Sequence, residues 1–225
     1  VFFGGGTPSL FSPDSIERLL ADIRARLPLV PGCEITLEAN PGTFERERFR
    51  AFRGAGVTRL SIGVQSFHDD SLRAIGRVHD AAQARAAVEE AARAFDSFNI
   101  DLMYALPGQS LAMALVDVER ALALQPTHMS HYQLTLEPNT VFAARPPAGI
   151  PDEDGAWDMQ DDCQALLATA GFAQYEVSAY ARDGRQCAHN LNYWRFGDYL
   201  GIGAGAHGKL TLGASQEVMR RWKHK

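Results

Sequence analysis

Short apolar segments alternate with longer amphipathic segments along most of the chain. A spacing of roughly 30 residues between apolar segments is typical of serial strand–helix units that build a parallel sheet. Strands are predicted at Val1–Phe3, Glu34–Glu38, Arg59–Gln65, Asn99–Tyr104 and Met129–Leu134, with a further one at Tyr175–Tyr180. The alternation predicts an α/β fold, either an open doubly wound sheet or a complete or partial barrel. Because only five or six units are visible, we expect that this chain alone does not close an eight-stranded barrel.

The amphipathic segments carry helix signals. Ser12 is a predicted N-cap, and Pro13 suits the first position of a helix that continues to Leu27. Further helices are predicted at Asp80–Ala94, from Ser110 to Leu122 and near Trp157–Ala170.

The composition of the chain changes after Thr140, where prolines and acidic residues form a predicted linker over residues 145–154. We therefore predict a partial barrel at residues 1–145 and a barrel-completing segment at 146–212. Residues 213–225 are predicted to start a C-terminal domain, and we expect no helix or strand in the basic cluster at 220–225. The start at Val1 and this ending predict a chain that is cut at both ends.

Composition excludes several classes of protein. The 46% hydrophobic and 22% charged content is that of a globular protein rather than a disordered one. A net charge of −5 argues against a general nucleic-acid binder, and no apolar run is long enough to span a membrane. Cys33, Cys163 and Cys187 have neither metal-ligand spacing nor the even count of a disulfide framework. We therefore predict a cytoplasmic protein.

A glycine-rich loop, Gly4-Gly5-Gly6-Thr7-Pro8, lies between the first predicted strand and the first predicted helix. Glycines allow a ligand to approach the backbone closely, and the free N–H groups of such a loop suit a carboxylate or phosphate. The alternative is a tight turn without a ligand.

Polar residues lie at or near the carboxyl ends of the predicted strands: Glu38, Asn40, Gln65, Ser66 and Asp101. In parallel α/β proteins these ends converge on the mouth where ligands bind. Arg77 follows a short predicted helix and offers a bidentate contact to a ligand carboxylate. The alternative is that strand ends are polar because loops are solvated, and that Arg77 is a surface arginine.

An aromatic segment, His189-Asn190-Leu191-Asn192-Tyr193-Trp194, precedes a glycine-rich stretch that ends in His207-Gly208. Imidazole is a common iron ligand, and the faces of Tyr and Trp can stack on a planar macrocycle. The alternative is a hydrogen-bonded histidine beneath an aromatic cover, with glycines that serve close packing.

Several motifs occur in the order found in one protein family. They are VFFGGGTPSL at Val1–Leu10, EANP at Glu38–Pro41, SIGVQSF at Ser61–Phe67, GRVH at Gly76–His79, NIDLMYALP at Asn99–Pro107 and YQLTLEPNT at Tyr132–Thr140. The chain thereby resembles the radical S-adenosylmethionine family of oxygen-independent coproporphyrinogen III oxidases. The HNxxYW motif at His189–Trp194 and the stretch Gly197–Lys209 resemble the subgroup regarded as heme chaperones.

The resemblance implies a partial TIM-like (β/α) barrel and assigns roles to individual residues. The S-adenosylmethionine contacts would be Gly5, Gly6, Thr7, Glu38, Gln65, Arg77 and Asp101, with a weaker correspondence at Thr135 and His207. His189 would bind heme, flanked by Tyr193 and Trp194. We assign no catalytic residue.

The resemblance also implies a [4Fe–4S] cluster, held in this family by a CxxxCxxC loop that precedes the GGGTP segment. The chain begins after that point, so we expect the cluster cysteines upstream of Val1 and no metal ligand in this chain.

Three functions remain open from the sequence. The first is a heme chaperone that delivers heme to acceptor hemoproteins such as respiratory enzymes. The second is a coproporphyrinogen III dehydrogenase of porphyrin biosynthesis, and the third is a βα-barrel that binds phosphate or a nucleotide. The sequence leaves a homodimer open.

Overall fold

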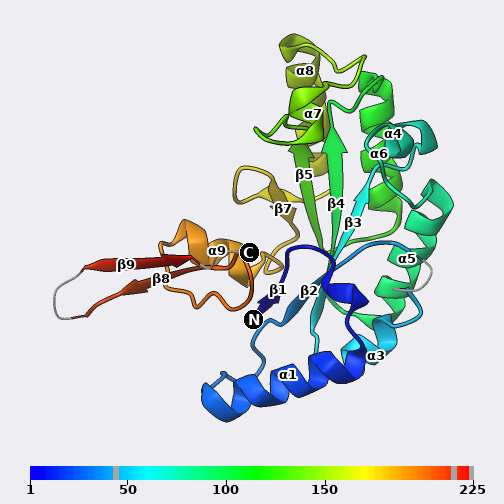
Figure 1. Ribbon diagram of the computed structural model, residues 1–225. Helices are drawn as coiled ribbons and strands as arrows, with labels where there is room; N and C mark the ends of the chain where they lie inside the picture. The colour runs from blue at the N-terminus through cyan, green and yellow to red at the C-terminus, as the bar shows by residue number, and fades with distance from the viewer. Residues whose placement is uncertain (43–45, 214–216, 223–225) are drawn as a thin grey trace. The chain divides into compact units, whose positions relative to one another are not determined.

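The computed structural model describes residues 1–42, 46–213 and 217–222 and divides into two compact units (Figure 1). Unit 1 comprises Val1–Arg185, and unit 2 comprises Gln186–Lys225. The domain boundaries predicted after residues 145 and 212 stay predictions.

The framework of unit 1 is a seven-stranded sheet. Its strands are β1 Phe2–Phe3, β2 Thr36–Ala39, β3 Arg59–Gln65, β4 Phe98–Tyr104, β5 His128–Gln133, β6 Ala173–Gln174 and β7 Ala179–Ala181. The strand order is β1-β2-β3-β4-β5-β7-β6, and neighbours from β1 to β5 pair in parallel. This order has no reversal among the parallel strands, which is the winding of a barrel and not of a doubly wound sheet. The sheet stays open within the described residues.

Helices connect the strands, and the longer ones lie along one face of the sheet (Figure 1). They are α1 Pro13–Arg26, α3 Phe49–Gly54, α4 Asp69–Ala74, α5 Ala81–Ala94, α6 Leu111–Ala123, α7 Val141–Ala144 and α8 Glu153–Thr169, with a 3₁₀ turn η1 at Pro8–Leu10. Ser12 caps α1 as predicted, and Asp80 begins α5 with a capping box. Helix α8 begins before the predicted Trp157 because the side chain of Asp152 caps it.

Alternation along the strands separates the core of unit 1 from its polar interior. All seven residues of β3 are buried. Leu60, Ile62 and Val64 pack into the hydrophobic core, whereas the intervening Ser61 and Gly63 line a polar cavity. In β4, Ile100 belongs to the same core and the neighbouring Asp101 lines the cavity. The helix-covered face therefore stabilises the sheet, and the opposite face is free to carry polar groups.

The strand predicted at Tyr175–Tyr180 differs in the structure. The chain instead forms two short antiparallel strands, β6 and β7, with a bend at residues 176–178 between them. Strand β7 also pairs antiparallel with β5, which ends the series of parallel strands. The alternating apolar pattern of 175–180 does not reveal this reversal, because half of that segment is the turn itself.

Unit 2 contains α9 Ala188–Trp194 and an antiparallel ribbon of β8 His207–Thr211 and β9 Val218–Trp222. The prediction of no strand in the basic cluster is wrong for Arg220–Trp222, which belong to β9. Residues 223–225 of that cluster lie outside the described residues. Across the part of the chain that the structure describes, no helix has the length and apolarity needed to cross a membrane.

Candidate functional site

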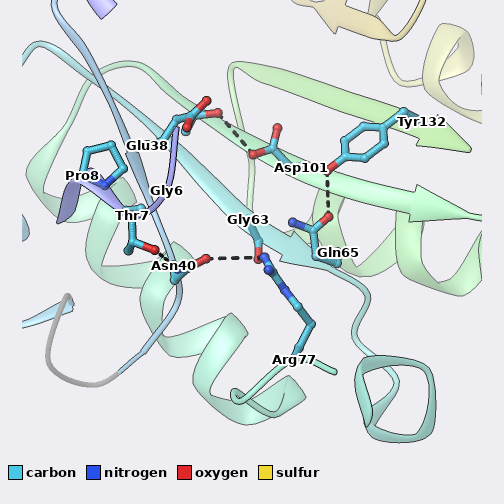
Figure 2. A pocket seen from close by; sticks show the side chains of 12 residues that line it. Gly6, Thr7, Pro8, Glu38, Asn40, Gly63, Gln65, Arg77, Asp101 and Tyr132 are labelled. Carbon is cyan, nitrogen blue, oxygen red and sulfur yellow. Dashed lines mark hydrogen bonds between the residues drawn. The ribbon is translucent and has the colours of Figure 1, made fainter. Parts of the chain in front are cut away.

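A polar cavity of about 220 Å³ opens at the carboxyl ends of strands β2 to β5 (Figure 2). It is lined by Gly6, Thr7, Pro8, Glu38, Ala39, Asn40, Ser61, Gly63, Gln65, Arg77, Asp101 and Tyr132. Six of the seven residues predicted to contact S-adenosylmethionine line this cavity, and Gly5 adjoins it through a hydrogen bond to Glu38. The strand ends thus bring these residues together across about a hundred positions of sequence.

The glycine loop is tied to the second strand. The backbone N–H of Gly5 donates to Glu38 Oε2 at 3.0 Å. Gly5 and Gly6 have φ values of 80° and 63°, a region that side chains with a Cβ rarely adopt. Glycine is therefore required here by the backbone conformation, and the loop is oriented by a carboxylate from the cavity wall.

Asn40 joins the loop to Arg77. Its Nδ2 donates to Thr7 Oγ1 at 3.2 Å, and Arg77 Nη2 donates to Asn40 Oδ1 at 3.4 Å and to the carbonyl of Gly63 at 3.0 Å. A Cβ on Gly63 would lie 2.8 Å from Arg77 Nη2, so glycine at this position makes room for the guanidinium. Burial lowers the pKa of Arg77, while Tyr132 and Asp101 act in the opposite direction.

Gln65 ends β3 in a left-handed conformation with φ of 70°. Its Oε1 accepts a hydrogen bond from the Tyr132 hydroxyl at 2.9 Å. Burial raises the pKa of Tyr132 above its ordinary value, so this hydroxyl stays a donor at neutral pH. Sequence reasoning missed Tyr132, although its place near the end of the predicted fifth strand was the available signal.

The loop after Gln65 is anchored by a buried carboxylate from α6. Asp117 is 1% exposed and accepts hydrogen bonds from Ser66 Oγ at 2.7 Å and from the backbone N–H of Phe67 at 2.6 Å. Gln109 Nε2 donates to the same carboxylate at 3.4 Å. Asp117 therefore fixes the segment that follows Gln65, a role with no signal in the sequence because Asp117 lies inside an ordinary helical pattern.

Asp101 is the second carboxylate of the cavity. Asn99 Nδ2 donates to its Oδ1 at 2.6 Å and Ser61 Oγ to its Oδ2 at 3.3 Å. Burial raises the pKa of Asp101 to about 6, and the charge of Glu38 raises it further, whereas hydrogen bonds and Arg59 oppose the shift. Behind Asn99, the imidazole of His128 contacts Asn99 Oδ1 at 2.6 Å, and burial lowers the pKa of this histidine to about 2. Asn99 and the neutral His128 thus form a hydrogen-bonded chain that supports Asp101.

The charges of the cavity fit a ligand that carries both signs. Glu38 and Asp101 suit cationic groups, and the Arg77 guanidinium suits a carboxylate. The ammonium, sulfonium and carboxylate of S-adenosylmethionine match this set. A phosphate ligand matches it poorly, because two carboxylates would repel it.

The cysteines do not form a site for an iron–sulfur cluster. Cys33 and Cys163 belong to unit 1 and Cys187 to unit 2, and Cys163 and Cys187 are buried. Burial raises the pKa of Cys163 to about 12, which keeps its thiol protonated. The described residues contain no group of three or more His, Cys, Asp or Glu side chains arranged to hold a metal ion. A [4Fe–4S] cluster therefore does not fit the donors of these residues.

Two residues of weaker correspondence lie elsewhere. Thr135 is exposed, donates a hydrogen bond to Glu137 at 3.0 Å and does not line the cavity. His207 begins β8 in unit 2. Their predicted contacts with S-adenosylmethionine stay predictions.

The HNxxYW motif forms helix α9 of unit 2. The rings of His189 and Tyr193 meet edge to face with centroids 4.8 Å apart, as expected for positions four apart on a helix. Tyr193 is 44% exposed and Trp194 is 52% exposed. Both side chains are therefore partly exposed to solvent.

The chain is similar to curated proteins over most of its length. A family model described as the radical SAM superfamily matches residues 1–121. The chain is 57% identical over 213 residues to "Heme chaperone HemW" of Haemophilus influenzae, covering 94% of this chain and 55% of that protein. For the Escherichia coli protein of the same name the identity is 55%, with 94% and 56% covered. The mouse "Radical S-adenosyl methionine domain-containing protein 1, mitochondrial" is 44% identical, with 94% and 49% covered. The chain thus spans about half the length of the curated relatives it matches.

Among solved structures, the chain is similar to coproporphyrinogen III oxidase (HemN) from Escherichia coli, which is described as a radical SAM enzyme. The TM-score is 0.79 at 25% identity, and the match covers 92% of this chain and 51% of that one. An archaeal Elp3 from Methanocaldococcus infernus shares the fold with a TM-score of 0.57 at 17% identity.

Proposed function

The chain belongs to the radical SAM superfamily, and we propose that it is the heme-binding chaperone form of that scaffold. The observation that carries the proposal is the HNxxYW helix α9, which presents His189 together with two exposed aromatic rings. Identities of 55–57% to two proteins named heme chaperone support the same choice. Imidazole ligation of iron and aromatic stacking on the macrocycle are the interactions that such a helix offers.

In this proposal the cavity of unit 1 holds S-adenosylmethionine. Arg77 would bind the carboxylate of the methionyl part, and Glu38 and Asp101 would face its cationic groups. Gly5, Gly6 and Thr7 would close over it, with Gln65 held in place by Tyr132. The resemblance supports these roles, and the charges of the cavity agree with them.

Heme is then cargo, and its delivery to acceptor hemoproteins such as respiratory enzymes belongs to the same proposal. A [4Fe–4S] cluster is implied by the superfamily, but its ligands are not among the described residues. A homodimer and a cytoplasmic location stay predictions.

A second candidate function is favoured by one observation. The similarity to HemN at a TM-score of 0.79 keeps coproporphyrinogen III oxidase as the enzymatic alternative. An anaerobic assay for protoporphyrinogen formation from coproporphyrinogen III separates the two, and the chaperone proposal expects no product.

Heme titration of the full-length protein tests the proposal. We expect stoichiometric binding to the wild type and, for His189→Ala, loss of the imidazole-ligated absorption spectrum. The matched control is His68→Ala, which removes an imidazole that precedes α4 in unit 1 and is expected to leave the spectrum unchanged. Failure of the wild type to bind heme overturns the function, whereas an unchanged spectrum of His189→Ala removes only this residue from it.

A further inference from the structure

Unit 2 contains a cavity of about 330 Å³, lined mainly by residues that follow the HNxxYW motif in the chain. It is lined by Tyr193, Phe196, Gly197, Tyr199, His207, Gly208, Lys209, Arg220, Arg221 and Trp222. Four of these residues are aromatic and three are lysine or arginine, whereas none is acidic. Such a wall suits a ligand with a flat apolar body and an anionic edge.

The pairing of the ribbon explains how these side chains gather. His207 pairs with Trp222, and Lys209 pairs with Arg220. Directly paired residues point to the same face of an antiparallel ribbon, and so do residues two apart on one strand. One face of the ribbon therefore combines an aromatic ring with two cations and an imidazole.

The two cations on this face differ in their partners. Lys209 Nζ donates to Asp198 Oδ1 at 3.1 Å and to the carbonyl of Phe196 at 2.6 Å, so its charge is compensated. Within the part of the chain that the structure describes, Arg220 forms no ion pair. Arg220 is consequently the positive charge of this face that is available to an external anion.

The cavity is continuous with the HNxxYW helix. The Tyr193 ring lines the cavity and also contacts the His189 ring, and the centroids of the Tyr193 and Tyr199 rings are 4.7 Å apart. A planar ligand bound beside α9 would therefore have aromatic walls and a cation from the ribbon within the same unit. Heme has that combination, because two propionate carboxylates lie at one edge of a flat macrocycle.

We propose that Arg220 binds a propionate carboxylate of heme, so that the β8–β9 ribbon recognises the anionic edge of the macrocycle. This inference rests on the proposed function and adds to it a residue that distinguishes carboxylated tetrapyrroles from neutral ones. A guanidinium holds a carboxylate with two parallel hydrogen bonds, which gives geometric selectivity as well as affinity.

The test compares three tetrapyrroles on the full-length protein in the same detergent buffer: heme, heme dimethyl ester, and metal-free protoporphyrin IX. We expect the wild type to bind heme about tenfold more tightly than its ester, in line with one charge-assisted hydrogen-bonded contact. Arg220→Gln is expected to lower the affinity for heme and for protoporphyrin about tenfold. It should leave the affinity for the ester unchanged. Protoporphyrin has the propionates but no iron, so this arm separates the carboxylate contact from ligation at His189.

Arg195→Gln is the matched control. Arg195 is an exposed arginine at the end of α9 that does not line the cavity, so the same change of charge is expected to alter no affinity. Equal binding of heme and its ester by the wild type, or an equal loss for both ligands in Arg220→Gln, overturns the inference while leaving the chaperone proposal intact. A wild type that binds none of the three overturns both.

Discussion

The cavity in the sheet of unit 1 and the cavity on the ribbon of unit 2 hold their polar groups in different ways. In unit 1 the groups come from the ends of parallel strands and are fixed by hydrogen bonds to one another, such as Tyr132 to Gln65 and Asn40 to Thr7. In unit 2 the aromatic residues are largely exposed, and Arg220 makes no ion pair with another described residue. The first cavity is organised before a ligand arrives, whereas the second has side chains left to adapt to one.

This difference suits different ligands. A small zwitterion needs a few charges at fixed positions, because each hydrogen bond contributes only when its geometry is correct. A large macrocycle gains most from the apolar area it buries, and a cargo that must be passed on does not need a rigid enclosure. The two regions should therefore respond separately to substitution.

Asp117→Ala should have the largest effect, and only on unit 1. The substitution leaves the donors of Ser66, Phe67 and Gln109 without their buried acceptor, so we expect a loss of about 3 kcal/mol in the free energy of unfolding. The released segment follows Gln65, so the affinity for S-adenosylmethionine should also fall, while heme affinity stays unchanged. Denaturant unfolding and two separate titrations measure these quantities.

Asp22→Ala controls for the loss of an aspartate from a helix. Asp22 lies on the surface of α1 in an ion pair with Arg26 at 3.2 Å, and such pairs contribute less than about 1 kcal/mol. If Asp117→Ala weakens heme binding as much as it weakens S-adenosylmethionine binding, the two cavities do not respond separately to substitution.

Gly201→Ala should weaken binding in unit 2 alone. A Cβ on Gly201 would overlap the backbone carbonyl of His207, which cannot move without displacing the start of β8. Overpacking of this kind costs about 1–3 kcal/mol, so we expect weaker heme binding with unchanged affinity for S-adenosylmethionine. Gly54→Ala in α3 is the control, because an added Cβ there meets no atom within 4 Å. Equal heme affinity in both variants would show that the ribbon takes no part in heme binding.

The sequence revealed unit 1 far better than unit 2. The carboxyl ends of the predicted parallel strands converge on one mouth, so the sequence grouped Gln65 with Asp101, and both line the cavity of unit 1. Tyr132 and Asp117 were missed because their roles depend on contacts between distant segments. The ribbon was missed because its register, and not its composition, gives Arg220 and Trp222 a common face.

Protonation of Asp101 should produce the smallest effect, a dependence on pH that is confined to the cavity of unit 1. Burial raises the pKa of Asp101 to about 6, so the folded protein binds a proton more tightly than the unfolded chain does. The contribution of this group to the free energy of unfolding is therefore fully present at low pH and is lost as the pH rises through 6. Ligand binding has the opposite dependence, because a cationic ligand prefers the ionised carboxylate.

We expect the affinity for S-adenosylmethionine to rise about tenfold between pH 5 and pH 7, as the ionised fraction of Asp101 does. Asp101→Asn should bind more weakly at pH 7 and lose this dependence, because the amide carries no charge at either pH. Calorimetric titration at several pH values measures both. In unit 2, Asp198 accepts hydrogen bonds from Thr211 and Lys209, and these lower its pKa, so its pairing with Lys209 should persist over the same range. A tenfold dependence that survives in Asp101→Asn would assign the titration to another group and remove Asp101 from the cation-binding part of the cavity.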